Sequence, residues 1–217
     1  MQLPIPDRSA AGRALAEALQ AYHRRDDVVV LALPRGGVPV ASEIADALGA
    51  PLDLMLVRKL GVPGYRELAM GAIASGGVQV MNEDVLAGSG VSAAAVEAVV
   101  EEERRELERR ERAYRGDRPW PDLKGRCVIL VDDGLATGAT MRAAVDAARA
   151  QGPDCIVVAV PVAPPDTVRR LAPTVDEVVC LHQPEPFMAI GQWYLDFSQV
   201  TDEEVRRILD AHWSRHP

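Results

Sequence analysis

Mostly apolar runs of strand length recur along the chain, and a helical pattern follows most of them. The runs span Val28–Leu33, Leu52–Val57, Cys127–Val131, Cys155–Val160 and Val175–Leu181. Runs of this kind are typical of strands that are buried on both faces of a sheet. Helical patterns over residues 38–48, 137–150 and 165–171 alternate with them. The alternation predicts an α/β fold, with a parallel sheet, right-handed crossovers and helices on both faces.

The sequence between the second and third of these strands departs from the alternation. Its first part, Gly61–Glu67, contains glycine and proline and predicts a mobile loop. Two short apolar runs, Ala69–Ala74 and Val78–Met81, flank the turn-forming residues Ser75-Gly-Gly77. This arrangement predicts a hairpin.

A long charged helix is predicted over Ser92–Arg115, and we interpret residues 92–116 as an insertion. Glutamates face arginines four residues on, as in Glu101 with Arg105 and Glu106 with Arg110. Because acids and bases alternate, the helix is a poor candidate for a nucleic-acid-binding arm. We expect it to pack on the domain or on a second subunit, as in a homo-oligomer. Its apolar positions recur every seven residues and form a narrow contact seam: Ala93, Val100, Leu107 and Tyr114.

Composition narrows the class of protein further. A length of 217 residues is typical of one domain with an elaboration, so we expect residues 1–217 to form a single domain. The formal net charge of −8 opposes non-specific binding to nucleic acid or to an anionic membrane. No apolar run approaches the roughly 18 residues of a membrane span. The first residues also lack the basic-then-apolar form of a signal peptide. We therefore expect a cytoplasmic protein with reduced cysteines.

Unusual residues follow the predicted carboxyl ends of three strands. Arg35-Gly36-Gly37 follows the first strand, Arg58-Lys59 the second and Asp132-Asp133 the third. Parallel α/β sheets bind their ligands at the carboxyl ends of strands. We therefore expect these three groups to border one site.

The stretch Val128–Thr140 has the features of a binding site for a sugar phosphate. Its small turn feeds a helix, so backbone N–H groups lie at the positive end of the helix dipole, and Thr137 and Thr140 add hydroxyl donors. Asp132 and Asp133 can accept hydrogen bonds from sugar hydroxyls or from water bound to Mg²⁺. The glycine patterns of P-loop and dinucleotide sites are absent from the sequence.

This pattern of an apolar strand, two acids and a turn ending in Thr-Gly-x-Thr resembles the type I phosphoribosyltransferases. The resemblance implies that phosphoribosyl pyrophosphate is the donor, with Asp132 and Asp133 on its ribose hydroxyls. It also implies Mg²⁺ as cofactor, held by the donor and water and by these two acids as candidates. The implied 5′-phosphate site consists of Ala136, Thr137, Gly138, Ala139 and Thr140.

Two other strand ends extend the resemblance. Pro34–Gly37 is similar to the pyrophosphate loop of the family, which has a strained or cis peptide, and the basic pair 58–59 is similar to the one before the family's flexible loop. The implied reaction is attack of a nucleophile on C1 of the donor, with pyrophosphate as the leaving group. The implied pyrophosphate-binding residues are Arg35, Gly36, Gly37, Arg58 and Lys59.

The acceptor is indicated less sharply. Many 6-oxopurine enzymes have an acid where this chain has Ala136, so the motif is closer to the adenine type. Tyr65-Arg-Glu67 resembles a loop that carries a catalytic acid in adenine enzymes, which makes Glu67 a candidate general acid or base. Val62 stands where a second lysine would be expected and argues against adenine. We expect a nitrogenous acceptor, with purine-like bases among the candidates. The candidate catalytic residues are Asp132, Asp133, Glu67 and Lys59.

Residues 182–200 are the candidate hood over the acceptor. They include Phe187, Trp193 and Tyr194, in a chain with nine aromatic residues in all. Such a cluster can stack on a planar base. It can equally form a small satellite core that anchors the C-terminal tail.

Two other functions use the same pocket. The protein could sense the donor as a regulator without turnover, although a nucleic-acid regulator should carry a basic face. It could also hydrolyse a sugar phosphate or nucleotide, for which Glu67 would have to activate water.

Overall fold

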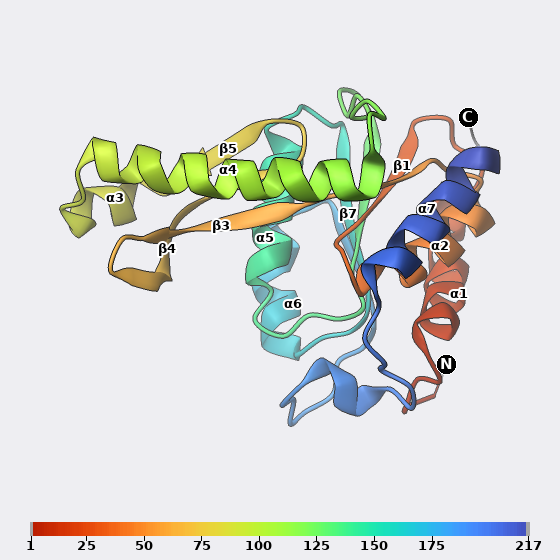
Figure 1. The fold of residues 1–217 in the computed structure, drawn as a ribbon. Helices are drawn as coiled ribbons and strands as arrows, with labels where there is room; N and C mark the ends of the chain where they lie inside the picture. Colours follow the sequence, from red (N-terminus) through yellow and green to blue (C-terminus); the bar gives the residue numbers. More distant parts are fainter. Residues whose placement is uncertain (1, 216–217) are drawn as a thin grey trace.

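The main sheet has five parallel strands in the order β2-β1-β6-β7-β8 (Figure 1). The computed structural model describes residues 2–215, apart from the side chains of Arg66 and Glu67. The predicted parallel α/β fold is confirmed. The strands are β1 (Val28–Ala32), β2 (Leu52–Leu54), β6 (Cys127–Val131), β7 (Cys155–Val162) and β8 (Glu177–His182).

Helices cover both faces of this sheet because its central strands are apolar on both sides. Along β1, Val28, Val30 and Ala32 pack into one core, and Val29 and Leu31 pack into the other. Alternate side chains of a strand point to opposite faces, so one apolar run supplies both cores. The helices on the first face are α1 (Arg8–Ala18), α2 (Gly37–Leu48) and α7 (Asp202–Arg215). Those on the second face are α5 (Ala139–Arg149) and α6 (Pro165–Leu171).

A second, antiparallel sheet of three strands replaces the loop that the sequence predicts over residues 61–67. Its strands are β3 (Val57–Val62), β4 (Tyr65–Ala74) and β5 (Val78–Met81). The glycine and proline signal marks only the tight turn at Pro63 and Gly64, where Gly64 has a φ of 83°. Leu60 and Met70 are fully buried, so packing of the two long strands overrides the local turn signal. The predicted hairpin of residues 69–81 is present as β4 and β5.

Helix α4 (Ala93–Arg115) crosses from this small sheet to the edge of the main sheet (Figure 1). Val100, Leu107 and Tyr114 are buried, as the seven-residue pattern predicts, whereas Ala93 is exposed. Its last residue, Arg115, is buried and donates two hydrogen bonds, of 2.8 and 2.9 Å, to the carboxylate of Asp53 in β2. The predicted pairs of Glu101 with Arg105 (2.9 Å) and Glu106 with Arg110 (2.8 Å) are also present.

The remaining described elements are short. They are α3 (Glu83–Ser89) and the 3₁₀ turns Gln20–Tyr22, Ala172–Thr174 and Ile190–Trp193. Across residues 2–215, no helix combines the length and the apolar content that crossing a membrane requires.

The segment between β8 and α7 lies beside the N-terminal residues (Figure 1, blue). Ile5 forms a parallel β-bridge with Tyr194. The Ile5 N–H donates to the Trp193 carbonyl at 2.7 Å, and the Leu195 N–H donates to the Ile5 carbonyl at 2.8 Å. The N-terminal residues are thereby joined to the segment after β8, next to the carboxyl end of β6.

Candidate active site

The loop after β1 and the acid pair after β6 are in direct contact. The two strands are neighbours, with Ala32 opposite Val131. A Cβ atom on Gly36 would lie 2.0 Å from an Asp133 carboxylate oxygen, and one on Gly37 would lie 2.6 Å from the Val131 carbonyl oxygen. Only glycine allows this close approach. The Gly-Gly pair is therefore needed for packing against the acids, whatever the loop binds.

The backbone of this loop has one of the features that the resemblance implies. The Pro34–Arg35 peptide is cis. The Gly37 N–H, predicted to bind pyrophosphate, instead donates to the Leu33 carbonyl at 3.1 Å. This leaves the N–H groups of Arg35 and Gly36 as the loop's candidates for an anion.

The Thr-Gly turn opens to solvent at the N-terminus of α5. Gly138 precedes the helix with a φ of 74°, a left-handed conformation that favours glycine. Thr137 and Thr140 are exposed, and the first turn of α5 contains no acid. The Ala136 carbonyl accepts a hydrogen bond of 2.7 Å from the buried Thr167 hydroxyl, which holds the turn against α6. An anion can therefore approach amides, hydroxyls and the positive end of a helix together.

The two carboxylates of the acid pair have different partners. One oxygen of Asp132 accepts the Asp133 N–H at 2.8 Å. Asp133 instead accepts a hydrogen bond of 2.8 Å from Nε of Arg8, and both side chains are only 11% exposed. Burial, together with the neighbouring Asp133 carboxylate, raises the pKa of Asp132 well above its usual range. Burial also raises the pKa of Asp133, but Arg8 opposes that shift. The pair is thus asymmetric, with the ionised form better supported at Asp133.

Arg8 is a site residue that the sequence analysis missed. It is the first residue of α1, its Nη1 donates to the Ser198 carbonyl at 2.7 Å, and its guanidinium lies 4.0 Å from the ring centre of Phe197. The Tyr194 hydroxyl donates to the Asp133 carbonyl oxygen at 2.6 Å. The N-terminus, the acid pair and residues 182–200 therefore form one connected network. Among 22 arginines, no local sequence signal marks Arg8.

The predicted hood aromatics divide into two groups. Tyr194 is buried against the acid pair and lies 5.0 Å from Phe197, ring centre to ring centre. Its ring belongs to the core, so it is not placed to stack on an acceptor. Phe187 and Trp193, whose ring centres are 6.0 Å apart, are half-buried. They remain the candidates for an acceptor-facing surface.

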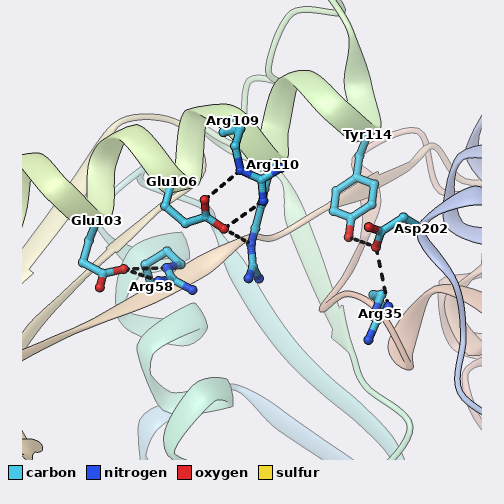
Figure 2. A network of polar contacts seen from close by, with 8 residues as sticks. All are labelled: Arg35, Arg58, Glu103, Glu106, Arg109, Arg110, Tyr114 and Asp202. Carbon is cyan, nitrogen blue, oxygen red and sulfur yellow. Dashed lines mark hydrogen bonds and ion pairs between the residues drawn. The ribbon is translucent and has the colours of Figure 1, made fainter.

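The predicted pyrophosphate-binding arginines have acidic partners on α4 and α7 (Figure 2). Arg58 Nε donates to Glu103 at 2.6 Å. Arg35 lies 3.7 Å from Asp202, which also accepts a hydrogen bond of 2.6 Å from the Tyr114 hydroxyl. Because consecutive strand residues point to opposite faces, Arg58 and Lys59 approach the site from different sides of β3, and pyrophosphate binding by both stays a prediction. Arg58 faces α4, so Lys59, which is exposed, points away from α4.

Glu67, the candidate general acid or base, belongs to β4, but its side chain lies outside the described part of the structure. No group of three or more potential metal ligands occurs among the residues that are described.

Known proteins resemble this chain in sequence and in structure. The model of the phosphoribosyl transferase domain family matches residues 3–191. Two similar proteins, each named "Putative phosphoribosyl transferase" (MT0597 and Rv0571c), come from two strains of Mycobacterium tuberculosis. Each is 52% identical over 207 residues, which is 95% of this chain and 46% of the relative. The chain thus spans about half the length of these curated relatives. The crystal structure of TT1426 from Thermus thermophilus is similar, with a TM-score of 0.85 and 47% identity over 94% of this chain and 97% of that one.

Proposed function

Because the chain belongs to the phosphoribosyl transferase domain family, as a type I member, we propose that it transfers a phosphoribosyl group from phosphoribosyl pyrophosphate to a nitrogenous acceptor and releases pyrophosphate. The observation that carries the proposal is the contact between the acid pair and the Gly-Gly loop, next to the open Thr-Gly turn. These groups offer partners for the sugar, its 5′-phosphate and its pyrophosphate in one continuous place.

Each part of the donor binds a different group of the site, and this division orients the donor. The 5′-phosphate binds the amides and hydroxyls of residues 136–140. The ribose hydroxyls bind chiefly Asp132, because Asp133 already pairs with Arg8. The pyrophosphate lies near the Arg35 and Gly36 amides, with Lys59 as its cation.

A Mg²⁺ ion fits this site only as a companion of the donor. Mg²⁺ in proteins commonly uses one or two carboxylates together with phosphate oxygens and water. Asp132 can provide such a carboxylate, whereas the charge of Arg8 disfavours a cation at Asp133. When bound, the ion would neutralise negative charge on the pyrophosphate.

The reaction breaks the bond between C1 of the ribose and the pyrophosphate oxygen while the acceptor nitrogen bonds to C1. Negative charge accumulates on the leaving group, so preorganised amides and Lys59 would stabilise the transition state. Glu67 remains the proposed general acid or base, and the Phe187–Trp193 pair the proposed acceptor surface. The small residue at Ala136 favours a purine-like acceptor of the adenine type.

The test is pyrophosphate release from the donor and Mg²⁺ with a panel of purine and pyrimidine bases. We expect release that depends on one base or a small group of bases. Asp132→Asn should weaken donor binding and lower release, whereas Asp27→Asn, which alters a carboxylate just before the amino end of β1, should change neither. Donor binding without release on any base would reject transfer in favour of a sensor. Release that needs no base would indicate hydrolysis.

A further inference from the structure

A cavity of about 300 Å³ lies on the side of the pyrophosphate loop that faces α4. Pro34 and Arg35 of the loop form one wall, and Arg109, Arg110 and Tyr114 from the end of α4 form the other. A cavity of this size is at the lower limit for small-molecule sites, so it suits a small ligand rather than a nucleobase with its sugar.

The charge of the cavity wall is positive, although the whole chain carries −8. Among the side chains that the structure describes, three guanidinium groups line it, from Arg35, Arg109 and Arg110, and Asp202 contributes the only carboxylate. Glu106 lies beside the cavity and pairs with the two helix arginines. Counting both acids, the group still has a net charge of +1, from three positive and two negative side chains.

The ion pairs orient the arginines and engage only some of their donors. Arg109 donates to Glu106 through Nε and Nη2, at 2.8 and 3.0 Å, which leaves its Nη1 outside that pair. Arg110 bonds to Glu106 through Nε at 2.8 Å, and Figure 2 shows its guanidinium tip extending past Glu106, away from α4. The 3.7 Å separation between Arg35 and Asp202 is longer than a hydrogen bond, so Arg35 can turn toward an anion at little cost. Guanidinium groups bind phosphate oxygens in pairs of parallel hydrogen bonds.

We propose that Arg109 and Arg110 of α4 form, with Arg35, a phosphate-binding site that takes the distal phosphate of the donor's pyrophosphate group. The identity of this ligand rests on the proposed function. The long charged helix then has a binding role, because it supplies two cations to the cavity that borders the loop. Glu106 and Asp202 hold the three arginines in place while the donor is absent.

The test compares the affinities of phosphoribosyl pyrophosphate, inorganic pyrophosphate and ribose 5-phosphate, measured by calorimetry with Mg²⁺. Arg110→Gln should weaken binding of the first two by about ten- to a hundredfold, because it removes a hydrogen bond between charged groups. Binding of ribose 5-phosphate should not change, since it lacks the distal phosphate. Arg110→Lys should recover part of the loss, because lysine keeps the charge but not the fork.

Arg105→Gln is the matched control, because Arg105 lies on the same helix and pairs with Glu101 at the same spacing, but is 76% exposed and outside the cavity. It should leave all three affinities unchanged. An equal loss of ribose 5-phosphate binding in Arg110→Gln would overturn the inference, as would unchanged donor affinity. Loss of pyrophosphate binding with unchanged donor binding would assign the cavity to a free anion and also overturn it.

Failure of the proposed function has a different signature. It appears as absence of base-dependent pyrophosphate release by the unaltered protein. The inference is judged by the ratio of donor to ribose 5-phosphate affinity, which does not require turnover.

Discussion

Replacing Arg8 with methionine should destabilise the fold by about 3 kcal/mol, because it leaves the Asp133 carboxylate buried without its cation. The two side chains are each 11% exposed and meet at 2.8 Å. Breaking a buried pair from one side costs about 3–5 kcal/mol, and we take the lower figure because some exposure remains. Methionine keeps part of the apolar stem, so the loss reports the charge rather than a cavity.

Thermal and denaturant unfolding measure this effect. For a protein of this size, about 3 kcal/mol corresponds to a fall in Tm of roughly 6–12 °C. Arg13→Met is the matched control on the same helix. Arg13 pairs with Glu43, but the two side chains are 59% and 32% exposed, so its loss should cost less than about 1 kcal/mol.

A double-mutant cycle isolates the pair itself. Asp133→Asn in the Arg8→Met background removes the uncompensated charge, so the double variant should be more stable than the sum of the two single effects predicts. Stability of Arg8→Met within about 0.5 kcal/mol of the unaltered protein would refute the reasoning. Simple additivity of the two substitutions would refute it equally.

Two further predictions concern the same strand ends. Because burial raises the pKa of Asp132, the folded protein keeps the proton of this carboxyl group up to a higher pH than the unfolded chain does. The unfolding free energy should therefore fall as the pH rises from about 4 through the raised pKa. Denaturant titrations at several pH values measure this slope, and Asp132→Asn should flatten it. Gly36→Ala should destabilise the fold by about 1–3 kcal/mol in the same assay, because its Cβ would lie 2.0 Å from an Asp133 oxygen. The control is Gly88→Ala in helix α3, where a Cβ meets no atom within 4 Å, so this variant should be neutral or slightly stabilising.

Much of the fold follows from the sequence because its signals are local. The apolar strands identify the parallel sheet, and the seven-residue pattern identifies the buried line of α4. The sequence predicts a loop over residues 61–67 because the signal of the Pro63-Gly64 turn is local and strong. The pairing of β3 with β4 depends on Leu60 and Met70 reaching a distant core, which no local pattern records.

The candidate site likewise has features that local sequence signals predict and features that depend on residues far apart in the sequence. The adjacency of the strand-end motifs could be predicted, because the carboxyl ends of parallel strands share one edge. The Arg8–Asp133 contact could not, since 125 positions separate the two residues. The different directions of Arg58 and Lys59 follow from strand alternation, but only once both residues are known to lie within a strand.

The contact between the Gly-Gly loop and the acid pair changes how these two motifs of the proposed donor site should be interpreted. The Asp133 carboxylate occupies the space that a side chain on Gly36 would need, and Arg8 pairs with the same carboxylate oxygen, Oδ2. Packing alone therefore requires the glycine and accounts for one of the acids, even in a protein that binds the donor without reacting. The proposed transfer activity needs, in addition, side chains that act on the leaving group. Lys59, exposed on β3, is the proposed cation for that role, so its replacement by methionine should lower pyrophosphate release while changing the unfolding free energy by less than about 1 kcal/mol, because contacts of exposed charges contribute little.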